Sequence, residues 1–447
     1  MNRRSIVGPL SLIVLGGMFL ADNVLPDFEV FKLFSEYWPF LLIAWGGLRL
    51  LEVLILAATS RPLPARGLSG GEVFLAVMIC IIGSTTFAIG KHAPRIRLGN
   101  RGMEIFGETY DYPLAVEKQA GEKPRVVIDH LRGNVRVKGE ETKVVRVSGR
   151  KTVRAYNKAD ADKANEQTPL EVTVEGDRIL VRTNYDRAPE NRRITADLEI
   201  SVPRGATIEG RGRLGDFDVT EVEGSVDYSS DNAGVRLNRI GGNAKVDVRR
   251  SDVVRAVDVK GNVTISGSGR DVELENIAGE AAIKGSFGGN LEFKNVAKVF
   301  RFDSRNTELR IERLPGRVSM DLGSLAAMNL VGPVKLKTQS KDVKLEEFTD
   351  LLELEIERGD IELRPHSLPL SKIAARCRSV GNIEVVLPPA AKFELSATTD
   401  RGETRNDWGD GVKTDSDGRS ASMKGKVGTG PTLALMTSRG TITLRKE

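Results

Sequence analysis

The chain shows two different patterns of hydrophobic and polar residues. Its first part holds three apolar runs of roughly bilayer-spanning length, at 5–21, 38–59 and 72–90. From residue 125 onward, aliphatic and polar residues alternate in short stretches, as in strands that are buried on one face. We therefore expect helices over 1–91 and strands after a linker at 92–124.

The alternating part also repeats. A representative line is GNVTISGSGRDVELENIA, which contains a strand, a polar turn, a second strand and another turn. Successive lines open at Gly224, Gly242, Gly261 and Gly279, 18 or 19 residues apart. A period near 19 without a helix predicts a parallel β-solenoid, here of about ten rungs over 222–447. The side chains expected to point inward in one line are Val263, Ile265, Val272 and Leu274.

Two regions depart from this pattern. Residues 125–221 are less regular, and we expect them to form the leading strands that cap the rod. Residues 401–425 form a polar, glycine-rich loop near the C-terminus. The predicted fold class is a membrane-anchored all-β protein, with a transmembrane helical unit of about three spans followed by the parallel β-solenoid.

The charges around the apolar runs set the expected orientation. Arg3 and Arg4 precede the first run and Arg61 and Arg66 separate the second from the third, whereas the loop between the first two is acidic. By the positive-inside rule the N-terminus is cytoplasmic and the C-terminal domain is extracytoplasmic. We therefore expect a multi-pass protein of the bacterial cell membrane. A cleaved signal peptide at 1–21 is the alternative, although it lacks a small-residue cleavage site.

Two residue pairs in this unit are candidate contact sites. Arg49 and Glu52 lie three apart inside an apolar run, so they share a helix face. They form an internal ion pair, or Arg49 marks the end of a short span and extends towards the cytoplasm, or the pair contacts a partner membrane protein. Tyr37 and Trp38 lie where the second span would enter the interface, and are candidate anchors to membrane lipid.

Two family resemblances follow from particular stretches. The basic start, LADNVLPDF and WPFLLIAWGGLRLL resemble the LiaF-type membrane region of bacterial envelope-stress proteins, over about residues 1–60. LEISVPRGATIEGRGRLGDFDVTEVEGSVDYSS and GPTLALMTSRGTITLRKE resemble an adhesin-like domain of unknown function, over about 125–447. The second resemblance implies a β-solenoid and supplies no catalytic residue.

A glycine motif raises the question of nucleotide binding. Gly210, Gly212 and Gly215 match G-x-G-x-x-G, but a dinucleotide loop needs a helix after its last glycine. Phe217 and Val219 follow with strand spacing instead. We expect these glycines to serve tight turns.

Composition excludes several kinds of chemistry. The chain has 66 basic and 61 acidic residues, of which residues 1–100 hold 9 and 6. The remaining 57 basic and 55 acidic residues nearly balance, so we expect no nucleic-acid partner. Cys80 and Cys377 are too far apart in the predicted fold for a disulfide. The histidines are His92, His130 and His366, whose separation argues against a catalytic triad or metal site. We expect no catalytic residue, cofactor or metal.

Three polar clusters leave alternatives open. Asp271, Asp342 and Asp360, with Asn290 and Asn382, recur before the second strand of a line, as either turn residues or an enzyme's stacked acids. Trp408, with Asp407 and Asp410, lies in the C-terminal loop, which is either solvated or a weak calcium or glycan contact. The densest basic patch is Arg249, Arg250 and Arg255, either solvated or facing an acidic envelope polymer.

These observations predict a non-enzymatic protein that binds or scaffolds an envelope component, as an accessory in envelope-stress signalling. The alternatives are an adhesin or structural rod with a simple anchor, and a polysaccharide-active enzyme. The expected partners are membrane lipid and either another membrane protein or an envelope polymer, with the oligomeric state open.

Overall fold

The computed structural model describes residues 30–58, 70–92, 97–99, 102–104, 108–187 and 193–447. The chain divides into two compact units. Unit 1 comprises 1–108 with 155–157, and unit 2 comprises 109–154 with 158–447. Each unit is described separately below.

Unit 1 contains two helices that pack on each other. They are α2 (Val30–Ala58) and α3 (Gly70–His92), followed by a small antiparallel pair, β1 (Arg97–Gly99) and β2 (Gly102–Glu104). The Trp38 ring lies so close to Gly83 that a Cβ there would come within 2.4 Å of it. Phe40 and Phe74 remain 64% and 70% exposed.

The predicted membrane unit is wrong. The run at 5–21 lies outside the described residues, and the other two fall on α2 and α3. Among the helices that the structure describes, none is long and apolar enough to cross a membrane. Arg49 and Glu52, which the prediction placed inside a span, are charged side chains that are costly in a bilayer, and α2 also contains Pro39. The membrane-anchored fold class, the transmembrane helices and the multi-pass location fail with it.

In unit 2 the strands join one 31-stranded sheet that winds back on itself, so that its strands occupy two faces. Face 1 contains β7 (Glu171–Glu175), β8 (Arg178–Arg182), β4 (Arg125–Arg132), β10 (Thr207–Leu214), β12 (Val226–Asn232), β14 (Ala244–Arg250), β16 (Val263–Gly269), β18 (Ala281–Phe287), β20 (Phe300–Asp303), β24 (Leu352–Arg358), β26 (Ile373–Val380), β32 (Thr432–Arg439), β28 (Phe393–Arg401), β31 (Ala421–Val427) and β30 (Val412–Ser416). Face 2 contains β3 (Glu108–Gln119), β6 (Val144–Ala155), β9 (Arg193–Pro203), β5 (Val135–Glu140), β11 (Phe217–Val222), β13 (Val235–Ile240), β15 (Val253–Val259), β17 (Asp271–Ile277), β19 (Leu291–Val296), β23 (Asp342–Phe348), β25 (Ile361–Arg364), β27 (Ile383–Leu387), β33 (Ile442–Lys446) and β29 (Thr404–Asn406).

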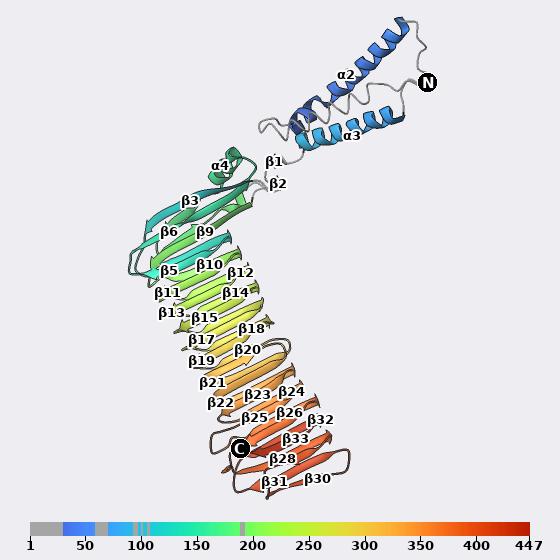
Figure 1. Cartoon of the computed structure of the whole chain (residues 1–447). Helices are drawn as coiled ribbons and strands as arrows, with labels where there is room; N and C mark the ends of the chain where they lie inside the picture. The colour runs from blue at the N-terminus through green and yellow to red at the C-terminus, as the bar shows by residue number, and fades with distance from the viewer. Residues whose placement is uncertain (1–29, 59–69, 93–96, 100–101, 105–107, 188–192) are drawn as a thin grey trace. The chain divides into compact units, whose positions relative to one another are not determined.

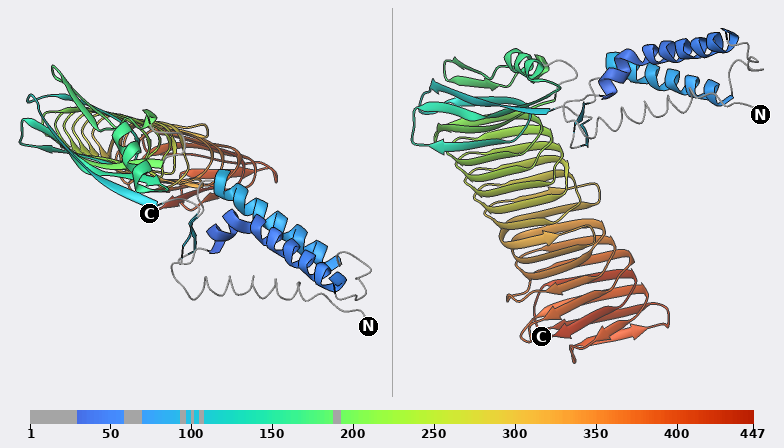
Figure 2. Two further views of the ribbon diagram at one scale, coloured as in Figure 1. Left: turned by 90° about the horizontal axis from the view of Figure 1, so that it is seen from above. Right: turned by 45° about the horizontal axis from the view of Figure 1, so that its top comes forward.

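Each turn of the winding, which we call a coil, contributes one strand to each face. Figure 1 and Figure 2 show these strands stacked in chain order from β10 to β20. Val246 of β14 lies beside Ile265 of β16, and Ala256 of β15 beside Leu274 of β17, all in parallel register. Because alternate residues point between the two faces, these aliphatic side chains are buried in a single core.

One coil runs in the opposite direction. The first half of strand β21 (Thr307–Met320) pairs antiparallel with β20 on face 1. After Pro315, its second half pairs antiparallel with β19 on face 2. Strand β22 (Ser324–Ser340) then returns antiparallel to β21 across both faces and restores parallel pairing with β23 and β24. We call β21 and β22 the reversed coil. The prediction of an all-parallel solenoid therefore fails here, because side-chain alternation is the same in either strand direction.

Both ends of unit 2 carry additional elements. At the N-terminal end, helix α4 (Lys158–Gln167) lies over β6, and the short helix η1 (Tyr185–Arg187) follows β8. Lys151 of β6 is buried and its ammonium donates hydrogen bonds to the carbonyls of Asn165 and Thr168, at 2.9 and 2.6 Å. At the C-terminal end, β31 pairs antiparallel with both β28 and β30.

Candidate binding surface

The surface of unit 2 is hollowed around the reversed coil. Four hollows, of roughly 670, 360, 490 and 300 Å³, each include residues of β21 or β22. The first lies on face 1 and the other three on face 2. Where the coil direction changes, two hairpin turns, at 304–306 and 321–323, connect the antiparallel strands.

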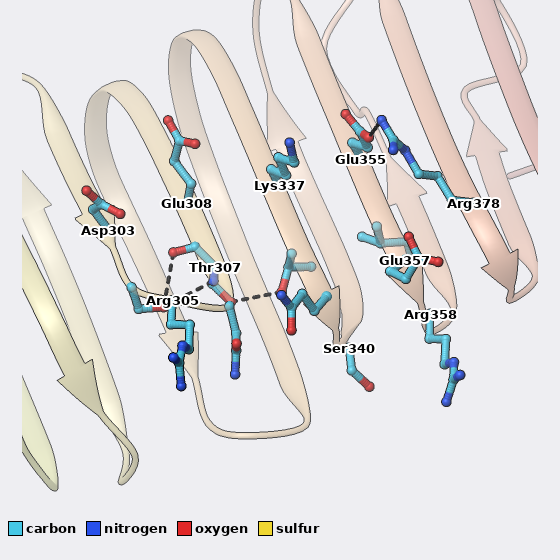
Figure 3. Close-up of a pocket in the computed structure, with 15 residues that line it drawn as sticks. Asp303, Arg305, Thr307, Glu308, Lys337, Ser340, Glu355, Glu357, Arg358 and Arg378 are labelled. Atoms are coloured by element: carbon cyan, nitrogen blue, oxygen red, sulfur yellow. Dashed lines mark hydrogen bonds and ion pairs between the residues drawn. The ribbon is translucent and has the colours of Figure 1, made fainter.

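The hollow on face 1 is lined by side chains of both charges. Figure 3 shows Glu308 and Lys337 on neighbouring strands, and the Arg378 guanidinium turned towards the Glu355 carboxylate, with which it forms an ion pair. Arg305 and Arg358 also line it, and neither has a carboxylate partner within 4.0 Å in the described part of the chain. Two guanidinium groups are thus available to a ligand.

The three hollows on face 2 adjoin one another. The second and third share Ala326 and Lys344, and the second and fourth share Lys294, Arg317 and Met328. Small side chains create the depression, because Ser319 and Ala326 lie directly opposite each other on β21 and β22. Together these hollows form a shallow groove across face 2.

The reversed coil also aligns like charges. Arg301 of β20 lies directly opposite Arg310 of β21, which in turn lies opposite Lys335 of β22. We call these three residues the basic row. Lys335 forms an ion pair with Glu353 at 2.7 Å. Arg301 and Arg310 have no ion-pair partner among the described residues.

Sequence reasoning missed this row. The segment 301–317 contains Arg301, Arg305, Arg310, Arg313 and Arg317, five arginines in seventeen residues. That density was a visible signal, but the register that puts Arg301 against Arg310 follows from the strand direction, which alternation does not reveal.

The stacked acidic residues have a structural role. Asp271 accepts a hydrogen bond from the backbone N–H of Asn290, and Asp342 one from Asp360, each at 2.9 Å. Asp360 in turn accepts from the backbone N–H of Asn382 at 2.8 Å. These carboxylates join successive coils at their corners, as the turn interpretation predicts. We call them the aspartate ladder.

The other potentially reactive side chains are dispersed. His130 is buried in β4, where burial lowers its pKa, while His366 lies near Glu447 at the far end of unit 2, at 3.4 Å. Cys377 is buried in β26, where burial raises the pKa of its thiol, and Cys80 lies in α3. The described residues contain no group of three potential metal ligands.

The three glycines of the nucleotide-like motif leave room for an aromatic ring or for a neighbouring backbone segment. Gly210 and Gly212 lie within β10, not in turns as predicted, under the ring of Tyr228. That ring stacks on Phe217 with centroids 3.9 Å apart. Gly215 occupies a corner with φ of +126° and is followed by strand β11 rather than a helix.

The predicted ligand loop contributes to the C-terminal end of the core. Trp408 is partly buried and packs edge-on against Phe393, with ring centroids 5.1 Å apart, and Lys446 lies over its ring at 5.5 Å. Asp407 approaches Arg445 at 3.6 Å, and Asp410 is exposed. A ligand at this loop stays a prediction, as does the alternative of a solvated loop.

For the remaining candidate residues, the structure gives their positions and does not test their proposed roles. Arg49 and Glu52 lie on α2, with side chains outside the described set, and a partner contact there stays a prediction. Tyr37 is exposed on α2. In the basic patch, Arg249 pairs with Asp231 at 3.5 Å and Arg255 with Glu273 at 3.2 Å.

Comparisons with known proteins identify no family. No protein-family model and no curated protein matches the chain. The crystal structure of a protein from Clostridium sporogenes ATCC 15579, whose name proposes a role in cell adhesion, matches 75% of this chain and 100% of its own. Its identity to this chain is 8% and its TM-score is 0.16. The name is compatible with the adhesin alternative, but a match at this TM-score carries no argument. The resemblance to the LiaF-type membrane region is wrong, because none of the described helices is long and apolar enough to cross a membrane. No family model supports the resemblance to the adhesin-like domain.

Proposed function

We propose that this protein is a non-enzymatic binding scaffold, and that an extended polymer partner lies across the reversed coil. The observation that carries the proposal is that four hollows lie along the reversed coil. The aspartate ladder supports a binding rather than a catalytic role, because its carboxylates are engaged by backbone N–H groups.

The shape of the hollows favours an extended partner over a small molecule. Sites for small molecules bury most of the ligand in a concave, largely apolar cleft. The hollows of the reversed coil are instead shallow, lie on the outer surface of a sheet, and are lined mainly by charged and small polar residues. Such a surface suits a linear polymer that contacts several strands in succession.

The proposal is tested by filling the hollows. The full chain is titrated with a panel of soluble linear polymers, comprising dextran, cello-oligosaccharides, chitosan oligosaccharides, polygalacturonate and dextran sulfate. Ser340→Trp fills the hollow on face 1 and Ala326→Trp the groove on face 2, while Ser229→Trp on β12 is the matched control. We expect one polymer to bind, with at least tenfold weaker binding in one filled variant and unchanged binding in the control. No binding, or equal binding by all variants, would contradict the proposal.

A further inference from the structure

The basic row is unusual in its combination of register and pairing. Like charges directly opposite each other on neighbouring strands are destabilising. Another arginine pair, Arg236 and Arg255 on face 2, also lies in direct register, but Arg236 contacts Asp216 at 3.0 Å and Arg255 contacts Glu273 at 3.2 Å. Arg301 and Arg310 have no such compensation in the part of the chain that the structure describes.

The spacing of the row fits a repeating anion. Neighbouring strands lie about 4.8 Å apart, so the three residues of the row span about 10 Å. All three are exposed, and the next position along the row on β18 is the uncharged Ala282. A chain with one negative charge in each repeat could therefore contact successive cations while running perpendicular to the strands.

The hollow on face 1 adds further cations beside the row. Lys337 is two residues from Lys335 on the same side of β22, and Arg305 lies in the turn before β21. Asp303 lies opposite Glu308 next to the row, and Glu308 lies opposite Lys337, so two acidic residues border Arg301 and Arg310 while a lysine borders Lys335. Asp303 and Glu308 disfavour an anionic chain at their own positions and leave Arg301, Arg310 and Lys335, with Lys337 beside them, as the contacts for it.

We propose that the basic row binds a linear polyanion, such as an acidic polysaccharide, through Arg301, Arg310 and Lys335. The inference rests on the proposed function, because it assigns a chemical class to the partner at the reversed coil. Guanidinium groups suit carboxylate, sulfate and phosphate oxygens, since they donate two parallel hydrogen bonds. Binding is expected to weaken as the salt concentration rises.

The test compares two double variants of the full chain. Arg301→Gln with Arg310→Gln removes the two arginines of the basic row. Arg236→Gln with Arg255→Gln is the matched control, with the same change in charge at another directly opposed pair. Polygalacturonate and dextran sulfate are the polyanionic probes, and dextran is the uncharged one. Circular dichroism and urea midpoints verify that both variants are folded.

We expect the first double variant to bind both polyanions at least tenfold more weakly, and the control to stay within twofold of the unchanged protein. Equal weakening in the two variants, or no polyanion binding at all, would overturn the inference. A further outcome separates the two proposals: if a neutral polymer binds and Ser340→Trp blocks it while Arg301→Gln with Arg310→Gln does not, the proposed function stands and the polyanion is wrong.

Discussion

Asp342 accepts a hydrogen bond from the backbone N–H of Asp360 at 2.9 Å, across the corner between two successive coils. Asp360 repeats the contact one coil further on, with the N–H of Asn382 at 2.8 Å. Each short polar side chain therefore provides an acceptor for a backbone donor that a regular strand pairing would leave unsatisfied. The recurrence that suggested stacked catalytic acids is explained by this stabilising role.

Replacing Asp360 with alanine should destabilise unit 2. Asp360→Ala leaves the Asn382 N–H without its acceptor, at a cost of about 1–2 kcal/mol. Asp360→Asn keeps the acceptor oxygen, as Asn382 does for the N–H of Thr441, and should restore most of the loss. Urea unfolding of the full chain measures both changes. Equal stability of the two variants would argue against the aspartate ladder as a backbone acceptor.

Gly215 should tolerate no side chain. A Cβ at this corner would lie 2.0 Å from the Gly133 carbonyl oxygen, and its φ of +126° disfavours other residues. We expect Gly215→Ala to lower stability by about 2 kcal/mol or more. Gly121→Ala, which meets nothing within 4 Å, is the matched control and should change stability little. A thermal midpoint of Gly215→Ala equal to that of the control would contradict this account.

Lys151 should make the free energy of unfolding increase with pH in the alkaline range. Burial lowers the pKa of Lys151 from its ordinary value of 10.5 to about 8 in the folded protein. Between these values the unfolded chain binds more protons than the folded one, so the free energy of unfolding should rise as the pH increases from about 8 to 10.5. Lys151→Met should remove this rise. Urea midpoints of both proteins across that range provide the measurement, and parallel profiles would show that Lys151 keeps its ordinary pKa.

We expect Trp408 to stabilise the C-terminal end of unit 2. Because the Trp408 ring packs against Phe393 at the C-terminal end of the core, Trp408→Ala should lower the free energy of unfolding by about 2–4 kcal/mol. The unfolding midpoint should fall accordingly. Asp410→Asn, at an exposed position in the same loop, should leave the midpoint unchanged. If calcium raised the midpoint of the unchanged protein and not that of Asp410→Asn, the ligand interpretation of the loop would gain support.

Alternation in the sequence predicted which side chains are buried, but not how the strands run. Val263, Ile265, Val272 and Leu274 all point into the core, as their spacing indicates. The same rule holds for β21, where Leu309 and Ile311 are buried although the strand is antiparallel to its neighbours. A period of two residues is unaffected by direction. The reversed coil, and the basic row that depends on it, therefore could not be derived from periodicity.

Other misses have different physical causes. Gly210 and Gly212 looked like turn residues because glycine is common in turns, whereas here they make room for the Tyr228 ring. The two apolar runs at 38–59 and 72–90 do fall on helices, but apolar composition alone did not establish that either could cross a membrane. In both cases the prediction relied on residue type alone.

The most direct test of a polyanion at the reversed coil is carbodiimide crosslinking of the full chain to oligogalacturonate. The reagent joins a carboxylate of the polymer to a lysine amine in contact with it, and mass spectrometry locates the lysine. We predict that crosslinks concentrate on Lys335 and Lys337, beside Arg301 and Arg310. Lys245, an exposed lysine on β14 of the same face, should carry few. Crosslinks spread evenly over exposed lysines, or concentrated on Lys245, would contradict the account.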